Sequence, residues 1–293
     1  MIINFQKVQM KNYSKLILPV LFLFLSGNSL SQIFSDRDKS ECNNRFAIAF
    51  EKNLSEKPIG DIIAEVGKTF LNTPYEAHTL EVADKEQLVI NFSGLDCTTF
   101  LETTFALARC IKQNKTTFDD FKNELQLIRY RDGKLDEYPS RLHYFSDWIF
   151  NNAKKGLIKD VTKEFGGKPI KFKVNFMSEN PHLYKHLKVN PEFVEEIKNQ
   201  EQEINKREYY FIPESEISKA ESRIQNGDLI ALTTSDKGLD IGHVGIAVKM
   251  PDGKIHFMHA PLVGSKVQIS ESSLSDYVKQ IKKHTGIIVL RAL

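Results

Sequence analysis

The last third of the chain is a series of short β-rich segments separated by turns, and this pattern limits the fold more than any other feature. The segments are GDLIALTT, GHVGIAVKM, KIHFMHAP, SKVQIS and HTGIIVLRAL, all between residues 227 and 293. Short apolar runs joined by turns such as PDG (Pro251–Gly253) predict antiparallel strands. Helical patterns precede them, so the sequence predicts an α+β fold with helices first and an antiparallel sheet last.

Three helices are predicted in the first 115 residues of the chain. Apolar residues recur at helical spacing within residues 32–52, in the segment that follows Pro58, and over about residues 96–113. The second of these helices should end at TPY (Thr73–Tyr75), because a residue before proline disfavours the helical conformation. Residues 80–93 (LEVADKEQLVINFS) are predicted to form one or two strands.

The middle of the chain, about residues 116–225, has a mixed pattern of helix and strand signals. RLHYFSDWIFNNAKKG indicates a helix that ends at Gly156. KPIKFKVNFM alternates lysine with apolar residues, as an edge strand does. The charged segment PEFVEEIKNQEQEINKREYYFIP is predicted to be a surface helix.

The N-terminus has the pattern of an export signal. Lys11 and Lys15 precede the apolar run Leu16–Leu25, and small residues end at Ser31, before Gln32. This order predicts a secretory signal peptide over residues 1–31. The run is short for a membrane span, although a membrane anchor is the alternative. We therefore expect residues 32–293 to form one exported domain, periplasmic or extracellular, with no membrane span after signal removal.

Composition narrows the function class. The chain is 41% hydrophobic, which allows a sizeable core, and its 40 basic residues nearly balance 38 acidic ones. That balance argues against a nucleic-acid partner. Three cysteines in an oxidising compartment suggest one free reactive thiol. Cys42 with Cys110 is one possible disulfide pair, although the sequence does not establish it.

Cys97 stands where a loop is predicted to become a helix. Unpaired N–H groups and the positive end of the helix dipole favour a thiolate there. A small buried core residue is the usual alternative for a cysteine, and it is the preferred interpretation of Cys110. The position of Cys97 predicts a nucleophile, which in turn needs a base.

His243, in the strand segment DIGHVGIAVKM, is the candidate base, although a histidine in a strand is often structural. Gly245 and Ala247 lie on its face of the strand, and these small residues leave room for another chain or a substrate. A three-residue loop at 251–253 would pair residue 245 with residue 259, which places His259 diagonally beside His243. A register shift of one residue would favour His256 as the orienting group instead.

A zinc site is the competing interpretation of the three histidines. His256 and His259 should point to opposite faces of their strand, and no carboxylate or cysteine partner is placed nearby. We therefore predict no metal, and no other cofactor is needed.

Several segments together resemble the DUF1460 family of exported bacterial proteins: LDCTTFLETTFALAR, RLHYFSDWI, VNFMSENPHLYKHL, GDLIALTT, GLDIGHVGIAV and HFMHA. That family is described as N-acetylmuramoyl-L-alanine amidase-like and belongs to the NlpC/P60 superfamily of papain-like cysteine peptidases. The resemblance covers about residues 55–290. It implies a papain-like NlpC/P60 fold with a family-specific insertion at about residues 116–225, and a catalytic set of Cys97, His243 and His259.

The resemblance also implies two substrate-binding residues. Relatives that bind the free amine of a stem peptide use an Asp before the Cys and an earlier Tyr, and these positions fall on Asp96 and Tyr75. Tyr75 lies in LNTPY, without the usual glycine. A helix N-cap and a packing tyrosine are the structural alternatives.

The implied function is a peptidoglycan or muropeptide hydrolase of the N-acetylmuramoyl-L-alanine amidase type. The alternative bond joins γ-D-Glu to the diamino acid, and Asp96 and Tyr75 would favour it. Arg141, His143 and Trp148 could shape that choice, although Trp148 is better interpreted as a core residue. A non-catalytic wall-binding module and a Cys–His acyltransferase are the remaining classes.

Overall fold

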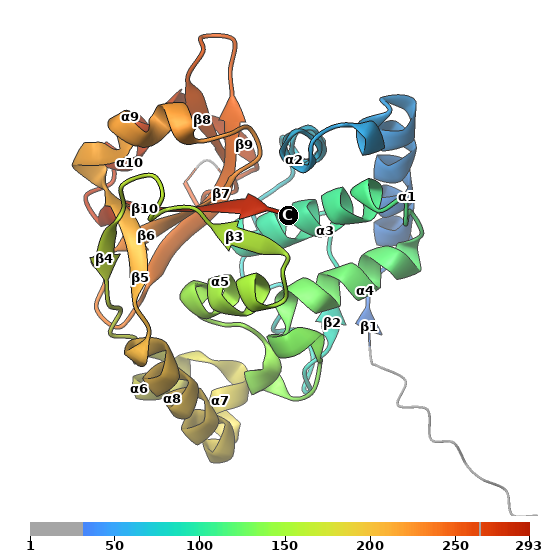
Figure 1. Ribbon diagram of the computed structural model, residues 1–293. Helices are drawn as coiled ribbons and strands as arrows, with labels where there is room; N and C mark the ends of the chain where they lie inside the picture. The colour runs from blue at the N-terminus through green and yellow to red at the C-terminus, as the bar shows by residue number, and fades with distance from the viewer. Residues whose placement is uncertain (1–31, 264) are drawn as a thin grey trace, which may run out of the picture.

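The computed structural model describes residues 32–263 and 265–293, and it shows the predicted α+β arrangement with an antiparallel sheet (Figure 1). The predicted signal peptide, residues 1–31, lies outside the described residues. Helices α1 to α4 gather on one side of the sheet in Figure 1, while α9 and α10 lie on the other. None of the helices in the described ranges is long and apolar enough to cross a membrane.

The helices match most of the predicted positions. Those of the N-terminal half and of the C-terminal end are α1 (Asp36–Glu51), α2 (Ile59–Lys68), α3 (Cys97–Lys112), α4 (Phe118–Arg129), α5 (Phe145–Lys154) and α10 (Leu274–Lys279). Those between β4 (Lys168–Ile170) and β6 (Leu229–Thr234) are α6 (Phe176–Glu179), α7 (Lys185–Val189), α8 (Pro191–Lys206) and α9 (Ile217–Ala220).

The main sheet has eight strands, and seven of them follow the order β4-β5-β10-β6-β7-β8-β9, with β3 pairing beside β10. They are β3 (Ile158–Asp160), β4 (Lys168–Ile170), β5 (Tyr209–Pro213), β6 (Leu229–Thr234), β7 (Ile241–Lys249), β8 (Ile255–His259), β9 (Gln268–Ser273) and β10 (His284–Ala292). All five predicted C-terminal segments are strands, and every pairing among them is antiparallel.

Alternation along the strands produces two cores, one on each face of the sheet. Val244, Ile246 and Val248 of β7 belong to the core that includes the inner sides of α2 and α3. Ala247 and its neighbours on the other face pack with residues of α9 and α10. The sheet is therefore covered on both faces, and the start of α3 meets the N-terminal half of β7.

One local prediction is confirmed in part, and two differ from the structure. Within residues 80–93 the only strand is β2 (Leu88–Val89), a two-residue parallel pair with β1 (Gln32–Ile33). The predicted surface helix ends at Lys206, because YYFIP pairs with β4 and β10 as β5. The segment RLHYFSDWI becomes helical only from Phe145.

Two other predictions are confirmed. KPIKFKVNFM contributes β4, which lies at the edge of the sheet. Gly156 follows α5 with φ +70°, the left-handed conformation in which glycine commonly ends a helix.

The disulfide considered from the sequence is not formed. The thiols of Cys42 and Cys110 are both free and buried.

Candidate active site

Cys97 is the first residue of α3, as predicted, and its side chain is partly buried. Asp96 is the N-cap: its Oδ1 accepts from the Thr99 N–H at 2.8 Å, and the Asp96 N–H donates to Thr99 Oγ1 at 2.9 Å. The N–H of Cys97 donates to no described residue. One unpaired backbone donor therefore remains beside the sulfur.

The predicted thiolate at Cys97 is wrong for the resting protein. Burial, and then the Asp96 carboxylate, raise the pKa of the Cys97 thiol to about 12. A backbone hydrogen bond from Val244 and the hydroxyl and N–H of Thr98 act in the opposite direction, but they are outweighed. Desolvation penalises the charged sulfur more than the helix start stabilises it.

His243 and His259 lie side by side, and their Nε2 and Nδ1 atoms are 2.8 Å apart. The hairpin has the predicted register: Ile246 lies opposite Met258, which puts residue 245 opposite residue 259. His256 points elsewhere and bonds through its ring nitrogens to the Ser270 carbonyl and the Asp252 carboxylate. The structure therefore brings His259, and not His256, to His243.

The hydrogen bond between the two rings determines which nitrogen can act as a base. If His243 donates from Nε2 to His259 Nδ1, its own Nδ1 is left free to accept a proton. Burial is the main cause that lowers the pKa of each ring to about 3, so both are neutral at ordinary pH. The pair is an uncharged base with a fixed orientation.

The prediction that Gly245 and Ala247 leave room for another chain or a substrate beside His243 is wrong, because the ring of Phe257 occupies that space. A Cβ on Gly245 would lie 2.7 Å from Cε2 of Phe257, so only glycine allows this packing. The Phe257 ring stacks on His259 and lies edge-on to His243, at centroid distances of 4.8 and 5.7 Å. The small residues on β7 thus fix the two histidines and do not admit a substrate there.

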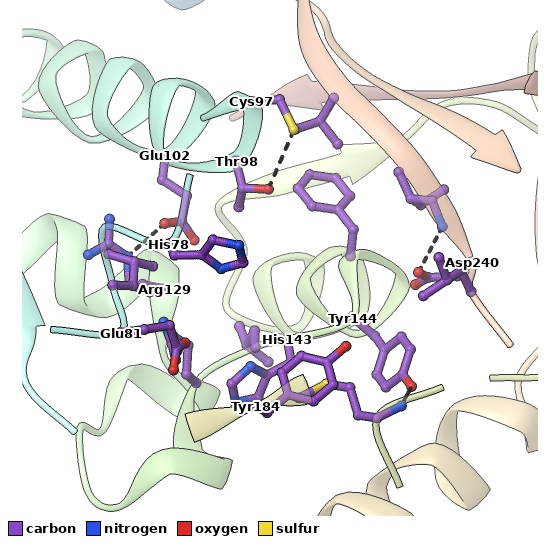
Figure 2. A pocket seen from close by; sticks show the side chains of 18 of the residues that line it. His78, Glu81, Cys97, Thr98, Glu102, Arg129, His143, Tyr144, Tyr184 and Asp240 are labelled. Atoms are coloured by element: carbon purple, nitrogen blue, oxygen red, sulfur yellow. Dashed lines mark hydrogen bonds and ion pairs between the residues drawn. The ribbon is translucent and has the colours of Figure 1, made fainter. Parts of the chain in front are cut away.

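A cavity of about 640 Å³ opens from Cys97 and His243. In Figure 2 Cys97 and Thr98 lie at one side of it, while Glu81, His143 and Tyr184 lie toward the other. Residues 239–244 form one wall, and the segment between β4 and β5 supplies another through Met177 and residues 183–185. The volume is typical of a small-molecule or peptide site.

Asp96 and Tyr75 do not line this cavity, but both lie next to Cys97. Burial is the main cause of the raised pKa of Tyr75, and the charges of Cys97 and Asp96 add to it. Tyr75 is held by its N–H, which donates to the Ser265 carbonyl at 2.7 Å. Asp96 is also the N-cap of α3, which is the structural role that the sequence offered as an alternative to amine binding.

The far wall of the cavity is charged. Arg141 is buried and bonds to Glu81 through Nη2 at 2.5 Å, and its Nε lies 3.3 Å from Glu86. His143 also lines the cavity, and burial lowers its pKa well below the usual value, so it is neutral. Trp148 is fully buried, as its core interpretation predicted.

Two residues near the reacting groups were missed from the sequence. Tyr277 of α10 has its hydroxyl 3.5 Å from His259 Nδ1, and burial, together with the charge of Cys97, raises its pKa to about 12. Asp240 is buried at the start of β7 and accepts from the N–H groups of Ser146 and Ile241, both at 2.7 Å. Neither has a motif of its own, because each is recognisable only by what it contacts.

The family model described as N-acetylmuramoyl-L-alanine amidase-like matches residues 65–287. The chain belongs to this family. The match spans α3, the His243–His259 hairpin and the insertion. No curated protein matches the chain.

Solved structures of similar proteins agree with the family. A protein of Bacteroides uniformis ATCC 8492 named an N-acetylmuramoyl-L-alanine amidase is 39% identical, with 80% of this chain and 99% of that chain covered and a TM-score of 0.77. A Bacteroides fragilis protein named as a candidate xylanase is 44% identical, with 78% and 99% covered and a TM-score of 0.74.

A more distant structure has the same fold. It is a Legionella pneumophila protein of the DUF1460 family, 22% identical, with 88% of this chain and 95% of that chain covered and a TM-score of 0.66. In the part of our chain that the structure describes, no group of three or more His, Cys, Asp or Glu side chains is placed to hold a metal ion.

Proposed function

We propose that this protein is a secreted cysteine amidase that hydrolyses a peptidoglycan amide, of the N-acetylmuramoyl-L-alanine amidase type. The observation that carries the proposal is the position of Cys97 and His243 on one cavity, with His259 2.8 Å behind His243. We further propose that the fold is the papain-like NlpC/P60 fold. The family described above supports the substrate class.

The mechanism follows from the protonation states. At rest the Cys97 thiol is protonated and His243 is neutral, so His243 Nδ1 takes the thiol proton as the sulfur attacks the amide carbon. The Cys97 N–H, which has no partner within the described ranges, donates to the oxyanion. His243 then returns the proton to the leaving nitrogen, and water hydrolyses the thioester. His259 holds the orientation of His243.

Two amide bonds are candidates. The family description favours the bond between N-acetylmuramic acid and L-Ala. The alternative, between γ-D-Glu and the diamino acid, needs Asp96 and Tyr75 to bind a free amine. Asp96 Oδ1 is already engaged by the Thr99 N–H and hydroxyl, which leaves one carboxylate oxygen for that purpose.

Glycoside hydrolysis is less well supported than amide hydrolysis. It usually needs two carboxyl groups that flank the sugar bond. Of the acidic residues in the cavity wall, Glu81 and Glu102 are each ion-paired to an arginine, and Asp240 accepts two backbone hydrogen bonds. All three are occupied by structural partners.

The test is digestion of defined muropeptides by residues 32–293, with products identified by mass spectrometry and Cys97→Ala as the control. Release of a whole stem peptide from the sugar is the expected result. Release of L-Ala–γ-D-Glu would move the function to endopeptidase and make Asp96 an amine anchor. If no product depends on Cys97, the hydrolase proposal is wrong, and an acyltransferase or wall-binding module takes its place.

A further inference from the structure

Arg141 is the feature of the cavity that the proposed reaction leaves unexplained. It lies in the wall opposite Cys97, only 6% of it is exposed, and no step of the chemistry uses it. Burying a guanidinium is unfavourable unless it is fully paired. The partners of its three nitrogens therefore show what this arginine can still bind.

Two of the three nitrogens face protein carboxylates. Nη2 donates to Glu81 Oε1 at 2.5 Å, whereas Nε lies within ion-pair distance of Glu86 Oε1, at 3.3 Å, without forming a hydrogen bond. The Arg141 guanidinium also lies over the ring of Tyr138, with its carbon 5.1 Å from the ring centroid. These contacts hold the planar group from two edges and one face.

The third nitrogen, Nη1, is free. It makes no hydrogen bond or ion pair to the described residues, and it is not one of the enclosed polar atoms. Because Arg141 is otherwise buried, its accessible part faces the cavity that it lines. A guanidinium held at two points with one N–H edge free is preorganised for an oxygen ligand.

The charges nearby indicate which oxygen ligand suits it. Glu86 also accepts from the Tyr130 hydroxyl at 2.8 Å, and burial raises the pKa of its carboxyl. Both Glu86 and Glu81 act as counter-charges of Arg141. Lys185 lines the same cavity, and it is ion-paired with Asp84 at 3.0 Å. Nη1 is the one nitrogen of Arg141 that no carboxylate of the described residues reaches, and a guanidinium edge of this kind pairs best with a carboxylate.

We propose that Arg141 is a specificity residue that binds a carboxylate of the stem peptide through Nη1. The inference rests on the proposed function, since it assumes that a peptide with ionised carboxylates occupies the cavity. Arg141 acts away from the reacting atoms, so it selects and places the substrate and takes no part in proton transfer.

The experiment changes the substrate and keeps the wild-type protein. Muropeptides are prepared in which the α-carboxylate of D-Glu, the carboxylate of the diamino acid or the terminal carboxylate is replaced by a carboxamide. Loss of one charge-assisted hydrogen bond should lower kcat/KM for one of these amides by about tenfold to a hundredfold, mostly through KM. Equal kcat/KM for every acid and amide would overturn the proposal.

Variants then assign the effect to Arg141. In Arg141→Lys the difference between the sensitive acid and its amide should shrink to about threefold or less, because a lysine cannot reproduce the fixed fork. Arg207→Lys is the matched control: it alters an arginine paired with Asp147 at 2.6 Å outside the cavity. Thermal unfolding shows whether each variant is folded. If Arg141→Lys folds and keeps the full difference, another residue binds the carboxylate and the proposal is wrong. If Arg141→Lys does not fold, the acid–amide comparison in wild type and Arg207→Lys still decides whether the cavity recognises a carboxylate, and equal values overturn the proposal.

A binding measurement separates this inference from the proposed reaction. Calorimetry on the Cys97→Ala protein compares the affinity of the same acids and amides without turnover. A preference of about tenfold or more for one acid supports Arg141 even if no muropeptide is cleaved, in which case only the amidase proposal fails. Cleavage by wild type without any such preference means that the amidase proposal survives and the Arg141 proposal fails.

Discussion

The two ends of the cavity are built on opposite electrostatic principles. At the reacting end, Cys97, His243 and His259 are all held neutral by burial. At the far end, burial opposes the charge of Arg141, but the carboxylates of Glu86 and Glu81 outweigh it and raise the pKa of the guanidinium. Burial acts on the ionisable groups of both ends, so the difference comes from whether each group has a partner of opposite charge.

This difference separates chemistry from recognition. A neutral thiol and a neutral imidazole can exchange a proton without first paying for a buried ion pair, and charge develops only as the substrate reacts. A paired guanidinium remains charged at any pH in which the protein is folded, so it can recognise a substrate throughout. We expect substitutions at the reacting end to lower kcat and those at the far end to alter KM or stability.

The largest effect should come from removing the base. In His243→Ala, kcat should fall by about 10⁴-fold, because no other group is hydrogen-bonded into position to accept the Cys97 proton. Steady-state hydrolysis of a muropeptide measures it, with KM expected within about threefold of wild type. If His243→Ala retains a tenth of the wild-type kcat, then His243 is not the main base, and the assignment of proton transfer to the reacting end is wrong.

At the charged end the largest effect should be on stability. Glu102 and Arg129 form a buried pair at 2.7 Å, and each side chain is 3% exposed. Glu102→Gln can keep the hydrogen bond from the Trp148 indole but leaves Arg129 uncompensated, so we expect a loss of about 3–5 kcal/mol in the free energy of unfolding.

Urea unfolding measures this loss. Glu216→Gln is the control, because it removes one member of an exposed pair with Lys168 and should change stability by about 0.5 kcal/mol or less. A similar small change in both variants would contradict the assignment of Glu102 to a buried structural pair.

A smaller loss of rate is expected from the orienting histidine. His259→Leu removes the acceptor for His243 Nε2, so kcat should fall by about tenfold to a hundredfold. His259→Asn restores an acceptor and should recover part of the loss, whereas a purely packing role would not distinguish Asn from Leu in this way. The ratio of kcat for the two variants is the measurement.

These residues show which parts of the site the sequence could predict. The helix start at Asp96 and Cys97 is local, because the cap and the apolar spacing lie within one segment. The partnership of His243 with His259 also followed from local information, since a short hairpin loop fixes its own register. Both predictions needed no knowledge of distant contacts.

The parts that could not be predicted depend on distant contacts. Glu81, Glu86 and Arg141 come from separate segments, and nothing in any one of them indicates that the three side chains meet. The charge state of Cys97 was predicted in the wrong direction because the helix start is visible in the sequence and the burial is not. The room expected beside Gly245 was also a wrong prediction, because the sequence does not show that the ring of Phe257 packs there.

The neutral histidines should also make stability depend on pH. In the unfolded chain each histidine has its ordinary pKa near 6.5, whereas the folded value is about 3 for His243 and His259. Between these values the unfolded state takes up protons that the folded state does not. Stability is therefore complete above about pH 6.5 and falls as the pH drops toward 3, by up to about 1.4 kcal/mol per pH unit for each ring.

Urea unfolding between pH 7.5 and 4.5 measures this slope. The comparison is with His259→Leu, which lacks one of the two rings and should have a shallower slope. If the wild type and the variant lose stability in parallel, the buried pair is not responsible for the pH dependence, and the neutral character of the reacting end would need another origin.

The smallest effect is expected from Tyr277, which tests how far the reacting end extends. Its hydroxyl is 3.5 Å from His259 Nδ1 and is close enough to Cys97 for the sulfur charge to affect its pKa. Tyr277→Phe removes one weak neutral donor from an otherwise unchanged ring packed on Phe257, so kcat should fall about twofold to fivefold. The rate of Cys97 alkylation against pH should show a higher apparent thiol pKa in the variant, because the Tyr277 hydroxyl can stabilise the thiolate.

The control is Tyr210→Phe, which removes a hydroxyl that donates to the exposed Glu208. An unchanged kcat and an unchanged alkylation profile would confine the reacting end to Cys97, His243 and His259, and Tyr277 would then serve only to pack α10 against the sheet.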